Sequence, residues 1–338
     1  MSNIKFSILV PAYNAANYIL YNLNSIKNQS YTNWEIVIVN DGSTDNTHDI
    51  VSNYILNNPQ LDIKLIDIHN GGLANARNIA LKAAQGDFFC NLDADDYLGS
   101  ETLQKIADAF GEDPCDVYYY DMASFEDGRE NNIRYSTGYK NKESAISGLD
   151  AAVLKLKREI WMCQGAAFYN LNMIKENDLW NVPGINQGED MYFITSALML
   201  AERVKYIPYL GFFCRVRRDS MMHSKFNPTH AQSLSAIKNL KNRTRKYHYG
   251  YKYIDELLLY IDREYLLQYL HVAKMICDRL GEISYRDVKS LMQKYLSKEK
   301  DFNKNAIPLL SRSHRIQLRL TNFPFVFSII CKLYYRLK

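Results

Sequence analysis

A short apolar segment ends in three carboxylates, and here the sequence gathers groups that could do chemistry. Phe88–Leu92 is mostly apolar and is followed by Asp93, Asp95 and Asp96. An apolar block bounded by polar residues predicts a buried strand, and open α/β sheets bind ligands beyond the carboxyl ends of their strands. Because Asp93 and Asp95 are two residues apart, both can direct oxygens at one point, where a hard divalent cation bound to phosphates would fit. The alternative is an acidic loop before a helix that begins near Ser100.

The elements around this segment alternate between strand and helix. Apolar runs predict strands, and apolar residues three and four apart predict helices. The predicted strands are 6–10, 34–39, 63–68 and 87–92, and the predicted helices lie near 19–26, 50–55, 73–84 and 101–110. Strands separated by helices of about ten to fifteen residues form parallel βαβ units with right-handed crossovers. The first half of the chain therefore predicts a doubly wound, mostly parallel sheet of the α/β class.

The second half has a looser pattern that ends in helices. Further strands are predicted at 116–122, 163–169, 205–208 and 210–217, with helices near 149–157 and 189–202. Asp127-Gly128 between two apolar runs predicts a hairpin turn. From about 228 to 296 the apolar spacing is helical. We therefore expect a sheet domain over residues 1–220 and a helical appendage over 221–338.

Composition and missing motifs exclude several classes of protein. With 338 residues, 47% hydrophobic and 23% charged, the chain has the composition of a globular protein. Its six cysteines include no Cys-x-x-Cys pair, which predicts reduced thiols and neither a disulfide framework nor a zinc site. We expect no secretory signal, and no apolar run reaches the ~18–20 residues that cross a bilayer.

Three nucleotide- or calcium-binding motifs fail on inspection. No Gly-x-Gly-x-x-Gly or Gly-x-x-x-x-Gly-Lys-Ser/Thr follows a predicted strand, which excludes dinucleotide oxidoreductases and P-loop enzymes. A calcium loop starting at Asp93 would need Gly and Glu where Leu98 and Gln104 stand. The acidic segment is therefore not a calcium sensor.

The last 38 residues are basic. Residues 301–338 contain seven Lys or Arg against the single acid Asp301, whereas the whole chain carries a net charge of +4. From Arg312 to Lys338 these bases alternate with apolar and aromatic residues, which is typical of a helix in the headgroup region of an anionic membrane. The alternative is a helix packed on the body or on a second subunit of a homo-oligomer. Nucleic acid is not expected as a partner, because no basic patch surrounds the predicted site.

Four sequence blocks together resemble a known family. They are Ile8–Asn14, Ile38–Asp45, Asn70–Asn78 and Leu92–Asp96, and their order and spacing are similar to those of family 2 glycosyltransferases with the GT-A fold. The resemblance covers roughly the first 100 residues. It implies transfer of a sugar from a nucleotide diphosphate donor with inversion at the anomeric carbon. It also implies Mn²⁺ or Mg²⁺ held by the Asp-x-Asp motif, with Asp95 as a direct ligand and Asp93 facing the metal or the ribose.

The resemblance implies a donor site built from the other blocks. Tyr13, after Pro11, would offer its ring to a uracil, and Asp41 would accept from the uracil imide N–H. Arg77 would reach the diphosphate or the carboxylates of the Asp-x-Asp motif. The alternatives are a packed loop residue for Tyr13, a helix-entry turn for Asp41 and a surface ion pair for Arg77.

A second acidic pair would supply the base. Inverting transfer needs a group that takes the proton from the acceptor hydroxyl, and a positioned carboxylate contributes about 10²–10⁴-fold. Glu189-Asp190 matches the family's Glu-Asp motif, which implies Asp190 as the base and Glu189 as a residue that binds the acceptor or orients the loop. The alternative is two acids favoured at a helix N-terminus.

A basic block after the last predicted strand completes the implied site. Arg217 and Ser220 would bind the donor diphosphate from a closing loop, and His223 would complete the metal shell. The alternative is a solvated basic loop.

The combined prediction is a bacterial-type, metal-dependent inverting glycosyltransferase. We expect it to move a sugar from a UDP-sugar to a hydroxyl of a lipid-linked oligosaccharide in capsule or O-antigen synthesis. We expect it to be cytoplasmic and peripheral on the inner face of the cell membrane. The alternatives are a protein or teichoic-acid acceptor with the same chemistry, and a non-catalytic module that binds nucleotide sugars.

Overall fold

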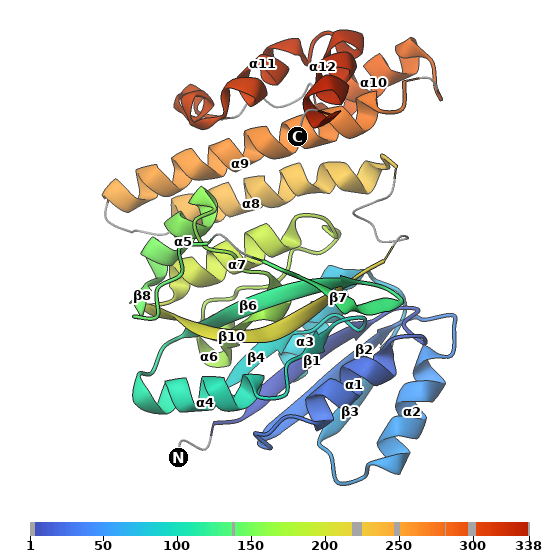
Figure 1. The fold of residues 1–338 in the computed structure, drawn as a ribbon, viewed down its shortest axis with the longest axis vertical. Coiled ribbons are helices and arrows are strands. Elements are labelled where there is room, and N and C mark those ends of the chain that lie inside the picture. The colour runs from blue at the N-terminus through green and yellow to red at the C-terminus, as the bar shows by residue number, and fades with distance from the viewer. Residues whose placement is uncertain are drawn as a thin grey trace. The chain divides into compact units, whose positions relative to one another are not determined.

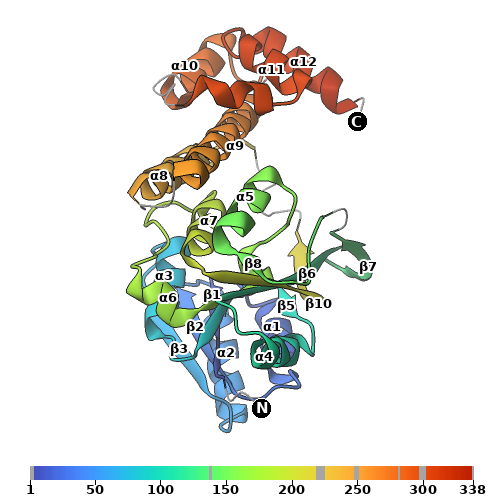
Figure 2. The same cartoon turned by 90° about the vertical axis from the view of Figure 1, so that its left-hand side faces the viewer.

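The computed structural model describes residues 4–136, 139–217, 225–246, 251–280, 282–296 and 302–336. The chain divides into two compact units, Met1–Arg218 and Asp219–Lys338 (Figures 1 and 2). The first is built on a sheet and the second on helices, and each is described by itself below. The predicted α/β class is confirmed for the sheet unit.

The first four strands of the sheet unit form its parallel half. They are β1 (Phe6–Ala12), β2 (Trp34–Asp41), β3 (Ile63–Ile68) and β4 (Phe88–Asn91), joined through helices α1 (Ile19–Lys27), α2 (Thr47–Asn57) and α3 (Leu73–Ala83). All pairs in the order β3-β2-β1-β4 are parallel. Every residue of β1 and β2 is buried, as expected for parallel strands covered on both faces. The three predicted parallel βαβ units are therefore present, although β1 continues past its predicted end before Pro11.

Beyond β4 the sheet becomes mixed. The remaining strands are β5 (Tyr97–Leu98), β6 (Val117–Glu126), β7 (Arg129–Tyr135), β8 (Ile146–Ser147), β9 (Ala167–Asn170) and β10 (Arg203–Val216). The order continues β4-β9-β6-β10-β5, in which β9 is antiparallel to both neighbours and β6 is parallel to β10. The two strands predicted at 205–208 and 210–217 form the single strand β10. Its register shifts near Leu210, because Pro208 has no N–H to donate to the ladder.

Helices and aromatic packing complete the sheet unit. Its later helices are α4 (Thr102–Glu112), α5 (Gly148–Lys157), α6 (Leu171–Glu176) and α7 (Glu189–Leu200), with the 3₁₀ turn η1 (Gln164–Ala166) before β9. In the core, Phe6 on β1 makes edge or tilted ring contacts with Phe88 and Phe168 at 5.2–6.5 Å. These contacts tie β1, β4 and β9 together in a closely packed core.

The second unit is helical. Its elements are η3 (Pro228–Ala231), α8 (Gln232–Lys246), α9 (Tyr251–Cys277), α10 (Tyr285–Leu296), η4 (Lys304–Leu309), α11 (Arg312–Leu320) and α12 (Pro324–Arg336). The long helix α9 contacts α8, α10, η4, α11 and α12 and is the centre of this unit (Figure 1). In the described parts of the chain, no helix combines the length and the apolar character that a membrane span requires.

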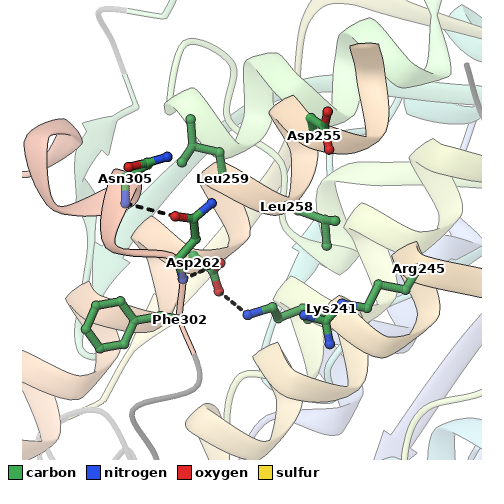
Figure 3. Close-up of a pocket in the computed structure, with 9 residues that line it drawn as sticks. Lys241, Arg245, Asp255, Leu258, Leu259, Asp262, Phe302 and Asn305 are labelled. Carbon is green, nitrogen blue, oxygen red and sulfur yellow. Dashed lines mark hydrogen bonds and ion pairs between the residues drawn. The ribbon is translucent and has the colours of Figure 1, made fainter. Parts of the chain in front are cut away.

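A cavity of about 640 Å³ lies inside the helical unit, between α8, α9 and residues 302–305 (Figure 3). At its edge Lys241 Nζ donates to Asp262 Oδ1 at 2.7 Å, and the other oxygen of Asp262 accepts from Asn303 N at 2.9 Å. The Lys241 and Asp262 side chains are only 8% and 3% exposed. Lys241 and Asp262 therefore form a buried ion pair.

The last two helices each have a buried and an exposed face. On α11 the side chains of Arg312, Arg315, Ile316 and Arg319 are exposed, at the helical spacing of three and four. On α12 Phe327 and Cys331 are buried, whereas the exposed apolar residues of this region are Phe323, Phe325, Val326 and Ile329. One face of each helix packs on the helical unit. The exposed residues of this region are arginines and apolar side chains. The membrane contact expected from the sequence stays a prediction.

Candidate active site

Arg77 brings together acids that are far apart in the sequence. Its Nη2 donates to Asp93 Oδ1 at 2.9 Å, and its Nη1 donates to Glu189 Oε1 at 3.2 Å and to Asp190 Oδ1 at 3.3 Å. The acids lie 16, 112 and 113 residues away along the chain. A planar guanidinium has five donors in fixed directions and can hold several carboxylates at once. The Asp-x-Asp segment and the Glu-Asp pair therefore share one site.

Exposure divides these four residues into two kinds. Arg77 and Glu189 are buried, with side chains 3% and 10% exposed. Asp93 and Asp190, by contrast, are 42% and 45% exposed. A buried charge must be paired, whereas an open carboxylate can meet a ligand. Arg77 and Glu189 thus form the buried floor of the site, and Asp93 and Asp190 form its open rim.

Local backbone geometry explains how the sequence positions Arg77. Gly72 has φ +84° and directly precedes α3, and the Gly71 and Gly72 N–H groups donate to the two oxygens of Asp41 at 2.7 and 2.9 Å. Gly72 can take this left-handed backbone without a Cβ penalty. A carboxylate that binds two successive N–H groups fixes the entry to α3, one turn before Arg77. Asp41 therefore holds the loop, and each of its oxygens keeps a further lone pair for the predicted uracil contact.

A glycine also sets the start of α7. Gly188 has φ +78° and is the residue before the helix, so Glu189 and Asp190 fall in its first turn. Acids are favoured there by the helix dipole. The two acids thus do lie at a helix N-terminus, which was the alternative explanation for the pair. The same two residues also contact Arg77.

Burial and charge shift the pKa values of the acids around Arg77. Burial, followed by the nearby Asp190 charge, raises the pKa of Glu189 to about 7. Burial also raises the pKa of Asp190, although the Arg77 guanidinium acts in the opposite direction. For Arg77 itself burial lowers the pKa, but the charges of the three carboxylates outweigh it and the net shift is upward. The Asp190 carboxyl is thus a stronger base than an ordinary aspartate.

Asp95 and Asp96 contact two further arginines, Arg217 and Arg215. Asp95 Oδ2 lies 3.1 Å from Arg217 Nε, and burial followed by the Asp93 charge raises the pKa of Asp95. Asp96 is buried and accepts from Arg215 N at 2.8 Å, so it faces away from the rim. Asp95 is thus the second acid of this segment with a charged partner at the site.

The donor set of Asp93 and Asp95 fits a hard divalent cation. Both are carboxylates, both are at least partly open, and their like charges act on each other. Within the described residues, no group of three His, Cys, Asp or Glu side chains is arranged to hold a metal ion. A divalent cation would therefore be coordinated by the carboxylates of Asp93 and Asp95. Phosphate oxygens of the donor would complete its coordination shell.

The other predicted site residues are placed as follows. Tyr13 is exposed and Pro11 is buried in β1, and the loop after β1 is held by Asn14, whose N–H donates to Ser43 Oγ at 3.0 Å. Ser220 and His223 lie outside the described residues.

Sequence reasoning missed Arg215 and its partners. Its guanidinium lies 4.8–5.1 Å from the rings of Phe125 and Tyr18, and its Nη1 donates to Asp127 Oδ1 at 2.8 Å. Its Nε donates to the backbone oxygen of Asp95 at 3.2 Å. This buried side chain ties the hairpin β6–β7 and the loop after β1 to the Asp-x-Asp segment. The only sequence signal was the basic block in which it stands.

Gln164 was also missed. Its Oε1 accepts from Asn91 Nδ2 at 2.7 Å at the end of β4, and its side chain is among the groups that lower the pKa of Asp190. The antiparallel strand β9 brings η1 to this place, and no local pattern predicts that pairing.

Comparisons with known proteins identify relatives of the sheet unit. The family described as Glycosyl transferase family 2 matches residues 7–176, half of the chain. The poly(ribitol-phosphate) beta-N-acetylglucosaminyltransferase TarS of Staphylococcus aureus (strain MW2) is 31% identical over 218 residues, which cover 64% of this chain and 36% of that protein. The chain thus spans about a third of this relative's length.

Solved structures extend the likeness over the whole chain. The crystal structure of S. aureus TarS 1-349 in complex with UDP-GlcNAc has a TM-score of 0.72 at 22% identity, covering 99% of this chain and 93% of that one. A mannosyltransferase from Pyrobaculum calidifontis in complex with GDP-Man and Mn²⁺ has a TM-score of 0.51 at 16% identity, covering 99% and 88%. At these identities the likeness shows the fold, and the predicted GT-A sheet followed by a helical region is confirmed.

Proposed function

The chain belongs to glycosyltransferase family 2, and we propose that it transfers a sugar from a UDP-sugar to an acceptor hydroxyl with inversion, using Asp190 as the base. That it is a glycosyltransferase follows from the family and its named relatives. The resemblance drawn from the sequence is thereby confirmed. The donor, the cation, the acceptor and the residue roles are the proposal.

One observation carries the residue roles. Arg77 contacts both Asp93, in the segment proposed to bind the donor, and Asp190, the proposed base. The base must reach the hydroxyl that attacks the anomeric carbon, so the donor-binding segment and the base must line one site. Had the two acids been on opposite sides of the sheet, no single transfer step could use both. Their shared guanidinium supports a single site.

The proposed reaction proceeds by displacement at the anomeric carbon. Asp190 takes the proton from the acceptor hydroxyl as its oxygen attacks, and UDP leaves from the opposite face. The upward pKa shift of Asp190 makes it a better proton acceptor than a free aspartate. Arg77 holds the ionised carboxylates of Asp190 and Asp93 in place, and Glu189 supports Arg77 from the buried side.

A divalent cation at Asp93 and Asp95 is part of the proposal. When bound, it would neutralise the charge that develops on the departing diphosphate. The carboxylate donor set supports Mn²⁺ or Mg²⁺, and so does the Mn²⁺ bound in the complex of the P. calidifontis mannosyltransferase. Asp95 would leave Arg217 in part to bind the cation, which frees the Arg217 guanidinium for a phosphate oxygen. The roles of Ser220 and His223, which lie outside the described residues, stay predictions.

The donor proposal has support from the S. aureus relative. Its structure is a complex with UDP-GlcNAc, and its name describes N-acetylglucosaminyl transfer. The exposed ring of Tyr13 and the fixed carboxylate of Asp41 support a uracil pocket at the ends of β1 and β2. UDP-GlcNAc is therefore the first donor to test, within a panel of UDP-, GDP- and dTDP-sugars.

Two acceptors remain candidates. A hydroxyl of a lipid-linked oligosaccharide is the first, supported by the exposed apolar residues beside arginines on α11 and α12. A teichoic-acid polymer is the second, and the poly(ribitol-phosphate) in the name of the S. aureus relative favours it. Incubation with radiolabelled donor and each acceptor, followed by detection of product on polyprenyl lipid or on soluble polymer, separates them.

Peripheral membrane binding is proposed for the same helices. Phe323 and Phe325 would insert among acyl chains while Arg315 and Arg319 pair with anionic headgroups. Sedimentation with anionic vesicles should fall when both Phe residues are replaced by Ser. Unchanged sedimentation of this variant would contradict the anchor.

The central experiment compares Asp190→Asn with the unaltered protein. The variant should bind UDP with unchanged affinity in calorimetry and should release no UDP in the presence of acceptor. The anomeric configuration of the wild-type product, followed by NMR, tests inversion. Retention of configuration, or full activity of Asp190→Asn, would overturn the proposal.

A further inference from the structure

Trp161 is a large aromatic side chain left open beside the site. It is 44% exposed, and its ring is stacked with that of Tyr139 at a centroid distance of 5.9 Å and an angle of 27°. Its indole N–H is already directed at Met122 Sδ, 2.8 Å away. The part of Trp161 that remains available is therefore ring surface and not the hydrogen-bond donor.

The other two tryptophans differ from it. Trp34 is buried in the core at the start of β2, and Trp180 lies under the Lys82 ammonium while its N–H donates to Asp178. Single exposed apolar residues are common on protein surfaces and need no explanation. An exposed indole that is backed by a second ring, and whose N–H is engaged by a third side chain, is a more ordered arrangement than that.

Contacts link Trp161 to residues that lie around Asp190. Met122, which receives the indole N–H, also lies 3.8 Å from Cys163 Sγ. Cys163 precedes Gln164, whose side chain acts on the pKa of Asp190. Burial raises the pKa of Cys163, and the charges of Asp190 and Asp96 contribute to that shift. Trp161 is thus linked through two side chains to the immediate surroundings of Asp190.

The chemistry of the exposed surface selects one kind of ligand. A pyranose ring has an apolar C–H face and a rim of hydroxyls, so it can lie on an indole while a neighbouring hydroxyl reaches a base. An extended polyol phosphate has no such flat apolar face. The cation nearest to Tyr139 in sequence, Lys140, is paired with Glu159. The aromatic pair therefore offers a surface for ring stacking.

We infer that Trp161, backed by Tyr139 and held by Met122, forms a subsite for a pyranose ring of the acceptor, next to the hydroxyl that Asp190 deprotonates. The inference rests on the proposed function, because it takes Asp190 as the base. It narrows the acceptor to one that carries sugar rings near the reacting hydroxyl.

The test separates acceptor binding from donor chemistry. Trp161→Ala should raise the KM for a saccharide acceptor about tenfold, which is ~1.4 kcal/mol, with kcat and UDP-sugar hydrolysis without acceptor nearly unchanged. Trp161→Phe keeps an aromatic face and should stay within about threefold of the unaltered protein. Trp180→Phe is the matched control and should leave the KM unchanged.

A binding measurement keeps the test independent of turnover. Titration of the Asp190→Asn protein with methyl β-glycosides of glucose, galactose and N-acetylglucosamine should change tryptophan fluorescence. The change should disappear in Asp190→Asn/Trp161→Phe and persist in Asp190→Asn/Trp180→Phe, whereas ribitol phosphate should give none.

Different outcomes overturn different claims. An unchanged acceptor KM in Trp161→Ala, with a melting temperature that shows intact folding, would overturn the subsite. A fluorescence change with ribitol phosphate but not with the glycosides would overturn the pyranose ligand. Full transfer by Asp190→Asn would instead overturn the proposed function, while fluorescence titration would still report on the subsite.

Discussion

Each unit contains a buried cation that pairs with acid, and the two sites differ in how open their acids are. In the helical unit Lys241 pairs with Asp262, and both side chains are almost fully buried. In the sheet unit Arg77 contacts three acids, two of which are nearly half exposed. A buried ion pair whose two members are both shielded from solvent is consistent with a structural role.

Excess negative charge at an open site needs another explanation. Three carboxylates around one guanidinium repel one another, which raises pKa values and costs stability. Such clusters persist where a bound cation or a proton transfer uses the charge. The comparison therefore separates a structural ion pair from a functional cluster, and the predictions below test this distinction.

The largest effect is expected for Asp190→Asn, which keeps the shape of the side chain but removes the base. The turnover number should fall about 10²–10⁴-fold, while UDP affinity stays nearly intact. UDP release and calorimetry measure the two quantities. Asp108→Asn, at an exposed carboxylate on α4, is the matched control and should change neither. Equal losses in both variants would contradict a specific role.

Arg77→Lys tests whether the cluster needs a fork or only a positive charge. An ammonium is a point charge and cannot span the acids that Nη1 and Nη2 hold. We expect a folded protein with transfer reduced more than tenfold, and Arg77→Met should also lose about 3–5 kcal/mol of unfolding free energy. Denaturant unfolding and initial rates check this. Normal turnover in Arg77→Lys would show that the site needs only the positive charge of Arg77 and not the geometry of its guanidinium.

Lys241→Met removes the buried ion pair of the helical unit, as Arg77→Met removes the ion pairs of the sheet unit. It leaves the buried Asp262 carboxylate without its cation and should cost about 3–5 kcal/mol of unfolding free energy. Lys241→Met/Asp262→Asn should recover most of that loss, because the asparagine has no charge to leave unpaired and its amide oxygen can still accept from Asn303 N. Chemical denaturation followed by circular dichroism measures both. A double variant as unstable as the single one would show that the pair does more than balance charge.

Asp95→Ala should weaken UDP binding about tenfold or more when Mn²⁺ is present, and should change it little in EDTA. The reason is the loss of one of two carboxylate ligands proposed for the cation. Calorimetry with Asp108→Ala as control checks it. Identical Mn²⁺-dependent affinity in the variant and the unaltered protein would remove Asp95 from the metal site.

The smallest effect is a shift in pH dependence. A base must be ionised, and burial raises the pKa values of Asp190 and Glu189, the latter to about 7. The turnover number should therefore rise with pH through an apparent pKa well above that of a free carboxyl, ~4. Charged and polar groups that act on this pair include Arg77, Asp93, Lys155 and Gln164, and Cys163 and Tyr169 also interact with Asp190. If the turnover number instead rose with an apparent pKa near ~4, the raised pKa values of Asp190 and Glu189 would not control the rate.

The sequence predicted the parallel half of the sheet well and its remainder poorly. Apolar runs located β1, β2 and β4 because fully buried strands are continuously apolar, and the partly exposed β3 alternates apolar and polar residues over part of its length. They could not show that β9 runs antiparallel between β4 and β6, since strand order depends on pairing across long separations. Arg215 was passed over for a similar reason, because its partners Tyr18 and Asp127 lie far from it along the chain, Asp127 by 88 residues.

By itself the sequence determined the α/β class, the family and the types of acid at the strand and helix ends. Local spacing and composition are sufficient for that, because each element forms from neighbouring residues. Only the tertiary structure decided that Arg77 holds Asp93 to Glu189 and Asp190, and that Asp41 fixes the loop from which α3 starts. These contacts arise when the sheet core brings strand ends together, and the partner of a side chain such as Arg77, 112 residues away, is set by that packing and not by its neighbours in the chain.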